Sequence, residues 1–250
     1  MDSFFDSRDT TEFDLLSPSH DIALAVITLL ALSLYLMRFT IRANPALRRA
    51  VRFGLALLLL LSEVGLNIWY VKQSLWDIHY TLPLELCSLT LLLSVVMLLT
   101  RSQMLYPFLF FAGIAGALQA LLTPNLVYGF PHFRFFHFFI AHGAIVLASL
   151  YMTWIEGYRP NWKSIVWAML LLNIFAGAVG VFDYLIGANY MFLTHKPDTT
   201  SLLDLLGPYP YYLLVEEGIA LFMFIMMYVI FFLIPDKIRR HSRSRKGARS

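Results

Sequence analysis

The chain consists of long apolar runs that are separated by short polar connections. A membrane-spanning helix needs about 20 mostly apolar residues to cross roughly 30 Å of hydrocarbon. Seven segments meet this requirement: residues 21–41, 50–71, 82–100, 104–122, 133–155, 163–186 and 211–234. The pattern predicts an all-α, polytopic membrane helical bundle of about seven transmembrane helices. The fourth segment is the weakest of the seven because it contains Gly113 and Gly116.

The composition excludes an ordinary soluble domain. Hydrophobic residues make up 59% of the chain, charged residues make up 14%, and the mean hydropathy is +0.67. Soluble domains are about 45–50% apolar and about 25% charged. We therefore expect one transmembrane domain over residues 21–235, with a mobile acidic arm before it (1–20) and a basic, disordered tail after it (236–250). The single cysteine, Cys87, excludes an intramolecular disulfide.

The positions of Lys and Arg predict the orientation, because cytoplasmic loops carry an excess of these residues. Bases are concentrated in alternate connections and in the tail: Arg42, Arg48, Arg49, Arg52, Arg101, Arg159, Lys163 and the run that starts at Lys237. This alternation places the amino terminus outside and the carboxyl terminus inside, as seven spans require. We expect a multi-pass protein of a cell membrane, the bacterial plasma membrane. Its basic tail is expected to contact anionic lipid headgroups rather than nucleic acid.

Polar side chains collect in the outer halves of the predicted spans. They are Glu63, Asn67, Glu85, Cys87, Gln119, Arg134, His137, His142, Asn173, Asp183, Glu216 and Glu217. Ionisable groups inside a membrane are costly and usually line a cavity or a functional site. Their common depth predicts one outward-facing polar chamber. The alternative is that each group bonds to a neighbouring helix or reaches the interface on its own.

Cys87 is the candidate nucleophile of this chamber. A thiol reacts only as the thiolate, which apolar burial disfavours, so Cys87 needs a base. Pro83 predicts a helix that begins just before it, which places Cys87 about one turn inside the helix. His137 and His142 are both candidate bases, and their depth does not choose between them. Glu85 lies two residues before Cys87 and therefore points to another side of the helix.

Several stretches together resemble one family. They are "LPLELC" (82–87), "QALLTP" (119–124), "RFFHFFIAHG" (134–143), "GANYMFLTHKP" (187–197) and "LGPYPYY" (206–212). In order and spacing they are similar to the YwaF-type integral membrane proteins, which are related to vertebrate transmembrane protein 164. That vertebrate relative resembles a membrane acyltransferase of ether phospholipids with an essential cysteine and histidine. It also looks related to small membrane lipid-ester hydrolases that use a threonine and a histidine.

The resemblance implies a lipid acyltransferase or acyl hydrolase that acts on phospholipids at the outer side of the membrane. The essential cysteine matches Cys87, which would form a thioester, and the histidine matches His142, which would serve as its base. The sequence departs from the bacterial members at Glu85, where they carry a histidine. A role that needs a base at this position is therefore altered here.

Other polar residues are candidates for supporting roles. Asn173 or Asn189 is expected to stabilise an oxyanion. Asn189, Tyr190 and Lys196, in an outward loop, would suit a phosphate headgroup, although an ordered loop cap explains the same residues.

Two further functions compete with acyl transfer. A transporter or small-molecule binding protein would use the same chamber and would not need Cys87. A structural subunit would need neither the cysteine nor the chamber. A metal site at His132, His137 and His142 is disfavoured, because their spacing of five places successive histidines about 140° apart on a helix. We expect no cofactor and no metal, and the oligomeric state stays open.

Overall fold

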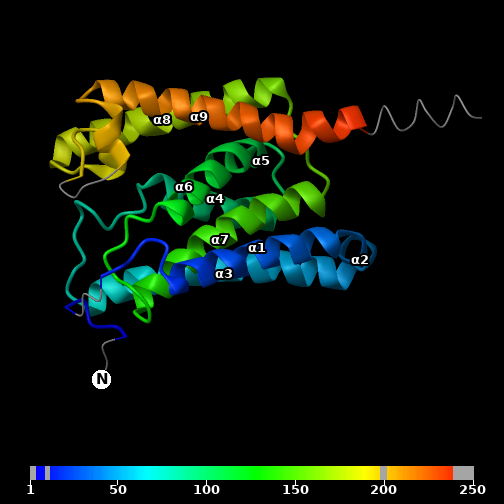
Figure 1. Cartoon of the computed structure of the whole chain (residues 1–250), viewed down its shortest axis with the longest axis horizontal. Helices are drawn as coiled ribbons and strands as arrows, with labels where there is room; N and C mark the ends of the chain where they lie inside the picture. Colours follow the sequence, from blue (N-terminus) through cyan, green and yellow to red (C-terminus); the bar gives the residue numbers. More distant parts are fainter. Residues whose placement is uncertain (1–3, 9–11, 198–201, 239–250) are drawn as a thin grey trace, which may run out of the picture.

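The computed structural model describes residues 4–8, 12–197 and 202–238, which form a bundle of long helices (Figure 1). The α-helices are α1 (Pro18–Leu36), α2 (Arg38–Ala43), α3 (Pro45–Lys72), α4 (Leu86–Thr100), α5 (Leu105–Phe108), α6 (Ile114–Leu122), α7 (Phe133–Trp154), α8 (Trp162–Ile186) and α9 (Tyr211–Tyr228). Two π-helical segments, η1 (Leu109–Gly113) and η4 (Val229–Leu233), and two 3-10 turns, η2 (Tyr190–Phe192) and η3 (Leu202–Leu206), complete the elements.

The bundle confirms the predicted polytopic membrane fold. Six of the seven predicted segments are helices long and apolar enough to cross a membrane. The fourth segment is a continuous helix over Leu105–Leu122, although it contains two glycines. The short one is instead α4, whose 15 residues span only about 22 Å. Its carboxyl-terminal end reaches the start of α3, because Arg101, which follows its last turn, lines one cavity with Arg48 and Arg49.

The predicted start of the third segment is wrong by about one turn, because α4 begins only at Leu86. The preceding residues form a turn in which the Thr81 hydroxyl donates to the Asp77 carbonyl oxygen (2.5 Å) and accepts from the Asp77 N–H (3.2 Å). Leu84 N–H bonds to the Leu82 carbonyl oxygen at 2.7 Å, which tightens the chain further. These local bonds use the backbone groups that a helix would need. Pro83 therefore lies in the turn and not in the helix.

Two helix ends also differ from their predicted positions. The first segment was expected to continue to residue 41, but α1 ends at Leu36, and α2 follows after Met37. The last span continues through Ile238, beyond the predicted boundary at residue 235. Asp236, which we assigned to the tail, accepts two hydrogen bonds of 2.9 Å from Arg159. The rest of the predicted tail lies outside the described residues.

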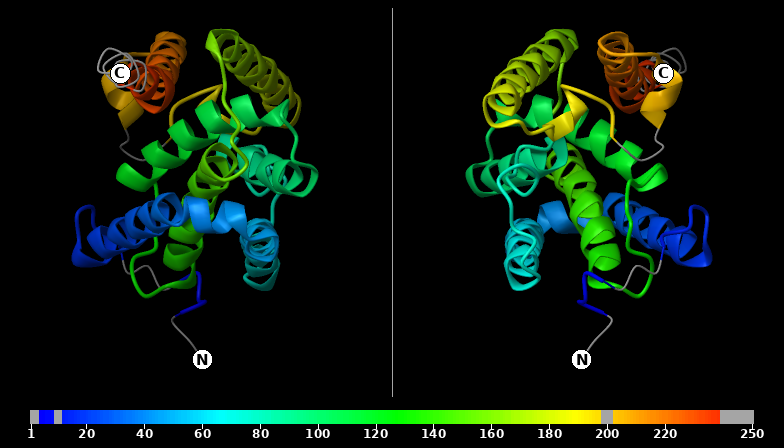
Figure 2. Two further views of the ribbon diagram at one scale, coloured as in Figure 1. Left: turned by 90° about the vertical axis from the view of Figure 1, so that its right-hand side faces the viewer. Right: turned by 90° about the vertical axis from the view of Figure 1, so that its left-hand side faces the viewer.

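Helix α7 forms the centre of the bundle, as the end-on views show (Figure 2). It is 78% buried over its most apolar window, whereas α1 is 6% buried and the last span is 17% buried. Helices α1, α3, α4 and α6 all pack on α7, and α8 and α9 pack on the opposite side of the segment formed by α5, η1 and α6. The outer helices thus present apolar side chains to lipid while α7 packs against protein.

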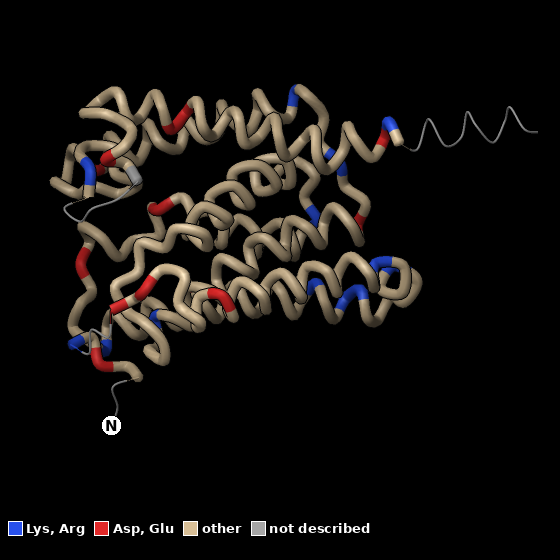
Figure 3. Tube along the Cα trace, in the orientation of Figure 1, with Lys and Arg blue, Asp and Glu red and all other residues tan. Residues whose placement is uncertain are grey.

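Charge is distributed unequally between the two ends of the bundle. Most Lys and Arg residues lie at the end where α3 begins and α4 and α7 stop, and most Asp and Glu residues lie towards the opposite end (Figure 3). Two acids at the basic end form ion pairs there, Glu156 with Arg48 and Asp236 with Arg159. The basic connections therefore share one end of the folded molecule, in agreement with the predicted orientation.

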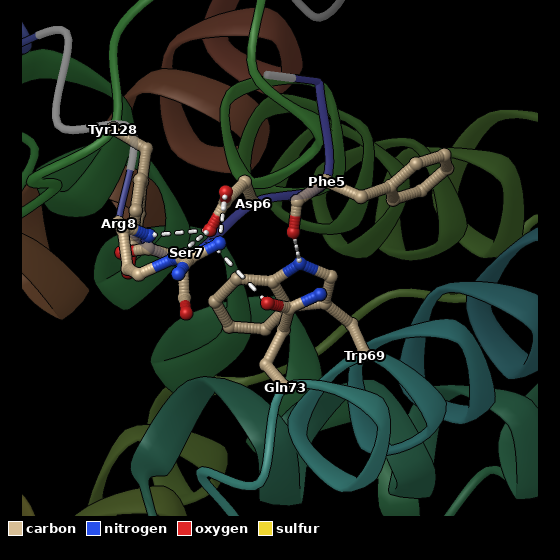
Figure 4. Close-up of polar contacts among 7 residues, drawn as sticks. All are labelled: Phe5, Asp6, Ser7, Arg8, Trp69, Gln73 and Tyr128. Carbon is tan, nitrogen blue, oxygen red and sulfur yellow. Dashed lines mark hydrogen bonds and ion pairs between the residues drawn. The ribbon is translucent and has the colours of Figure 1, made fainter. Parts of the chain in front are cut away.

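The amino-terminal arm lies against the acidic end of the bundle (Figure 4). Trp69 on α3 donates its indole N–H to the carbonyl oxygen of Phe5 at 2.9 Å. The N–H of Ser7 donates to Gln73 Oε1 at 3.2 Å, and the Tyr128 hydroxyl donates to the Ser7 carbonyl oxygen at 3.2 Å. Residues 4–8 are thus hydrogen-bonded to the end of α3. The mobility of the arm as a whole stays a prediction.

The short α4 makes the number of crossings testable. If α4 spans the membrane, the chain crosses it six times between Arg49 and the carboxyl terminus: once in α3, once in α4 and once in each of the four later spans. An even number of crossings places both points on one side, so a cytoplasm-specific fluorescent reporter should be active at both. If α4 does not cross, the two fusions will lie on opposite sides. Protease accessibility in sealed vesicles provides an independent reading of the same two positions.

Candidate functional site

Three helices approach one another closely at two glycines of the fourth span. A Cβ atom on Gly113 would lie 3.4 Å from Ile145 Cγ2 on α7 and 3.7 Å from Thr90 Cβ on α4. One turn along α6, a Cβ atom on Gly116 would lie 3.9 Å from Cys87 Sγ. Small residues allow helices in a membrane to pack this closely. Cys87 therefore lies at the contact of α4 with α6.

The same contact relates Cys87 to His142. Thr90 and Ile145 both contact Gly113, and Cys87 and His142 each precede one of these residues by three positions. Because α4 and α7 run in the same direction, a step of three residues takes both chains to the same level, one turn nearer the acidic end. Among the described residues no hydrogen bond joins the two side chains. We therefore infer that Cys87 and His142 lie at about the same height along α4 and α7, without a hydrogen bond between them.

Cys87 is the second residue of α4, which is closer to the helix start than predicted. The Glu85 side chain makes no capping bond, and the part of the chain that the structure describes provides no acceptor for the N–H groups of Leu86, Cys87 and Ser88. Such first-turn N–H groups carry the positive end of the helix dipole. They therefore favour negative charge on the sulfur atom or on an oxygen bound near it.

His142 is the only partly exposed residue in the stretch of α7 from Ala141 to Thr153, whose other residues are buried. Its Nδ1 lies 2.7 Å from the Phe138 carbonyl oxygen. A carbonyl oxygen can only accept, so Nδ1 must carry the hydrogen. In the neutral ring Nε2 then has a free lone pair. The helix backbone thus holds His142 in the tautomer of a general base.

His137 is held in the opposite tautomer. Its Nδ1 lies 3.1 Å from Arg134 Nη1, and a guanidinium can only donate, so Nδ1 must accept. The hydrogen of the neutral ring therefore lies on Nε2, and this nitrogen is buried. Arg134 also lies 5.7 Å from the centroids of the Trp69 and Tyr70 rings. The tautomers thus distinguish the two histidines as candidate bases, which their predicted depth in the membrane did not.

Glu85 connects the start of α4 to the outward loop. Its Oε2 accepts from the N–H of Met191 at 3.2 Å. Met191 has a positive φ of 56°, which is uncommon for a residue other than glycine. Glu85 thus points towards this loop and makes no hydrogen bond with Arg134 or a histidine among the described residues.

Tyr190 strengthens the same connection. Its hydroxyl accepts from the Leu82 N–H at 2.9 Å and donates to the Ile78 carbonyl oxygen at 2.7 Å. The Tyr212 hydroxyl, in turn, donates to the Phe192 carbonyl oxygen. Three of the family-like stretches, which are distant in sequence, are therefore joined by hydrogen bonds in the structure.

The remaining predicted supporting residues make their bonds elsewhere. Asn189 Oδ1 accepts from the main chain of Thr194 and His195 and from the Thr194 hydroxyl, and Asn189 Nδ2 donates to the His195 carbonyl oxygen, as in a loop cap. Asn173 on α8 donates to Glu217 on α9 at 3.0 Å. Lys196 lies 3.7 Å from Asp204. None of these contacts points to Cys87.

The polar residues expected around one chamber lie in several surroundings. Glu63 and Asn67 border an apolar-walled groove along α3, where Asn67 donates to Glu63 Oε1 at 3.3 Å. Asp183 on α8 is completely buried. Gln119 and Glu216 line a cavity of about 950 Å³ between the end of α6, the amino-terminal arm, α9 and the loop before it.

This outer cavity approaches Cys87 along two paths. Gln119 lies one turn beyond Gly116 on α6, a rise of about 4.5 Å. Phe192, which also lines the cavity, follows Met191, the residue bonded to Glu85. Gln119 and Phe192 are thus the lining residues that lie next along the chain to the neighbours of Cys87 and Glu85.

Sequence reasoning missed the residues that organise this site. Thr90, Ile145 and Phe138 are ordinary apolar or β-branched residues whose role lies in contacts or in a backbone oxygen. The three-residue spacing of Gly113 and Gly116 was the available signal, since it places both glycines on one side of a helix. The π-helical turn of η1 that ends at Gly113 had no comparable signature. Among the described residues, no group of three or more His, Cys, Asp or Glu side chains could hold a metal ion.

Comparison with known proteins gives one match. The model of the TMEM164 family matches residues 15–228. Searches of curated proteins and of solved structures find no match. The family match confirms the predicted relationship to transmembrane protein 164, and it covers every element from α1 to α9.

The Tyr190 connection generates a stability prediction. Tyr190→Phe should lower the free energy of unfolding by about 1–3 kcal/mol, because it leaves the Leu82 N–H and the Ile78 carbonyl oxygen without their partner. Tyr184→Phe is the matched control, since Tyr184 is 84% exposed. Denaturant unfolding in detergent measures both. Equal stability of the two variants would contradict a structural role for the Tyr190 hydroxyl.

Proposed function

Because the chain belongs to the TMEM164 family and is a multi-pass membrane protein, we propose that it is a lipid acyltransferase or acyl hydrolase with Cys87 as nucleophile and His142 as base. The observation that supports this proposal is the Gly113 contact, which brings together Thr90 and Ile145, the residues one turn after Cys87 and His142 on parallel helices. The Phe138 carbonyl oxygen holds the hydrogen of His142 on Nδ1, so Nε2 is the basic nitrogen. Phospholipids of the outer leaflet are the proposed substrates, and the bacterial plasma membrane is the proposed location.

The first half-reaction is proposed as follows. His142 Nε2 accepts the proton of the Cys87 thiol, and the resulting thiolate attacks the carbonyl carbon of a lipid ester. The carbon–oxygen bond to the glycerol breaks, and the imidazolium returns the proton to the departing alkoxide. The products are a thioester at Cys87 and a lysolipid. The Phe138 carbonyl oxygen, bonded to Nδ1, orients the ring throughout.

The second half-reaction reverses these roles. Neutral His142 removes a proton from the hydroxyl of an acceptor lipid, or from water, and the oxygen attacks the thioester. The carbon–sulfur bond breaks, and the imidazolium returns the proton to the sulfur. The two acceptors distinguish transfer from hydrolysis. An apo geometry without a Cys87–His142 hydrogen bond is compatible with this role, since catalytic bonds often shorten only when substrate binds.

The first-turn N–H groups of α4 are the proposed oxyanion donors. They belong to Cys87 and its neighbours and have no acceptor among the described residues. Donors that face the developing negative charge in a dry site stabilise the transition state strongly. This assignment replaces Asn173 and Asn189, whose amide groups bond to other partners.

The outer cavity is the proposed entrance for the lipid. Its volume of about 950 Å³ is within the range of sites for small ligands, about 300–1,000 Å³. Its lining is largely apolar but includes Gln119 and Glu216, so it offers surfaces for both an acyl chain and a polar backbone. The position one turn from Gly116 supports access to Cys87.

The covalent mechanism predicts separate effects for matched variants. Cys87→Ala should abolish acyl turnover of labelled phospholipid in nanodiscs and remove the acyl adduct from the intact-protein mass spectrum, while Ser88→Ala should preserve both. His142→Ala should lower turnover about a hundredfold or more. His137→Gln should have a much smaller effect, since its amide oxygen can still accept from Arg134.

The double variant tests whether Cys87 and His142 act as a unit. If they do, Cys87→Ala/His142→Ala will be scarcely slower than either single variant. Full activity of Cys87→Ala would overturn the covalent mechanism. A transporter would instead lose ligand binding in Glu63→Gln or Asp183→Asn and keep it in Cys87→Ala.

A further inference from the structure

A second cavity lies at the opposite, basic end of the bundle. Its volume is about 250 Å³, and four arginines line it: Arg48, Arg49, Arg52 and Arg101. The three arginines of α3 line the cavity together with Arg101, which follows α4, Tyr151 of α7 and Glu156, which follows α7. It is therefore remote from Cys87, which lies at the start of α4.

The cavity carries an excess of positive charge. Four arginines and one glutamate give a formal charge of +4 − 1 = +3. Glu156 is already engaged, since its Oε1 accepts from the Tyr151 hydroxyl at 2.9 Å and lies 3.7 Å from Arg48 Nε. Among the described residues, Arg49 and Arg101 make no side-chain ion pair. The protein itself thus leaves most of this charge without a partner.

Arg52 is the central observation. Its side chain is only 8% exposed, and its buried Nε has no hydrogen-bond partner among the described residues. Its guanidinium lies 4.7 Å from the centroid of the Phe53 ring, which supports one face of the group but accepts no hydrogen bond in its plane. A buried charged donor without an acceptor is costly. The buried Nε of Arg52 therefore needs an acceptor, and an anion in the cavity would supply one together with the compensating charge.

The position of the arginines on α3 adds a second cost. Arg48 lies in the first turn of α3, which begins at Pro45, and the helix dipole there favours negative charge and disfavours bases. Arg101 has a left-handed backbone (φ 55°), and its carbonyl oxygen accepts from the Tyr158 hydroxyl at 2.6 Å, which fixes it beside the cavity. An anion in the cavity would relieve both the dipole and the mutual repulsion.

We propose that this cavity binds the phosphate group of an anionic ligand, the headgroup of an anionic phospholipid or a free phosphate. Guanidinium groups bind phosphate oxygens through paired hydrogen bonds, and several of them can surround one phosphate. The volume suits a headgroup but not the acyl chains. Beside the cavity, α3 exposes Phe53, Leu57 and Leu61 by 47%, 55% and 58%, and these side chains provide an apolar path for such chains outside it.

The test uses the full-length protein in nanodiscs of phosphatidylcholine with or without phosphatidylglycerol. Native mass spectrometry should show retained phosphatidylglycerol on the wild-type protein. Binding should be at least about tenfold weaker in Arg49→Gln/Arg52→Gln/Arg101→Gln, because several charge-assisted hydrogen bonds are lost. Arg38→Gln/Arg42→Gln/Lys163→Gln removes the same charge from residues that do not line the cavity, and it should retain the lipid.

A second measurement distinguishes the two sources of phosphate. Inorganic phosphate, compared with chloride at equal ionic strength, should raise the unfolding temperature in phosphatidylcholine nanodiscs if the site accepts free phosphate. Phosphatidylglycerol retention without this shift assigns the site to the lipid headgroup. If neither probe binds, or if both triple variants lose binding equally, the proposal is wrong.

Folding of the variants is controlled separately. Arg101→Gln changes an exposed residue and should weaken retention without altering the unfolding temperature measured in phosphatidylcholine alone. Arg52→Lys keeps the charge but removes the planar set of donors, and it should also weaken retention. Retention at wild-type strength in both variants would overturn the assignment even if the triple variant fails to fold.

Discussion

The close approach of α6 to α4 and α7 at Gly113 and Gly116 sets the position of the groups in the candidate site. Between membrane helices, packing rather than the hydrophobic effect provides much of the association energy, so the absence of two side chains matters directly. A Cβ atom at either glycine would already be in van der Waals contact, with Ile145 and Thr90 at Gly113 and with Leu86 and Cys87 at Gly116, so a side chain larger than alanine would push against these residues. The Gly113 contact thus brings together Thr90 and Ile145, which follow Cys87 and His142 by one turn on α4 and α7.

A second set of contacts fixes where α4 begins. The turn at Asp77 and Thr81 uses the backbone before the helix, and Tyr190 and Glu85 attach that turn to the outward loop. Cys87 is consequently in the first helical turn, where N–H groups are free. The family-like stretches around residues 82–87 and 187–197 are explained by this contact, because each supplies the bonding partners of the other.

Sequence alone predicted the all-α membrane bundle well, because an apolar run of this length has few other structures available. Boundaries failed where local hydrogen bonds compete with helix, as at Thr81, or where the chain breaks briefly, as at Met37. Cys87 was expected about one turn inside its helix, but it is the second residue of α4. Glu63 and Asp183 were expected at the same depth, but Glu63 borders a groove along α3 and Asp183 is buried on α8. Depth alone does not show which side of the bundle a side chain occupies.

The choice between His137 and His142 could not be predicted for a different reason. It depends on which acceptor or donor lies beside each Nδ1, a carbonyl oxygen in one case and Arg134 in the other. The basic cavity likewise arises from residues of three helices. The charge of each loop was readable from sequence, but the burial of Arg52 was not.

Because α4 is short, Cys87 at its start lies some distance from the bulk solvent. Arg101 and Arg48 meet at one end of the bundle, and from there Cys87 lies 14 residues along α4, about 21 Å, whereas α3 continues for 24 residues to Lys72, about 36 Å. The thiol is therefore recessed by about 15 Å below the outer end of its neighbour. An acyl group carried on that sulfur would be held away from the bulk solvent. Such shielding would slow its loss to water and give a second lipid time to receive it.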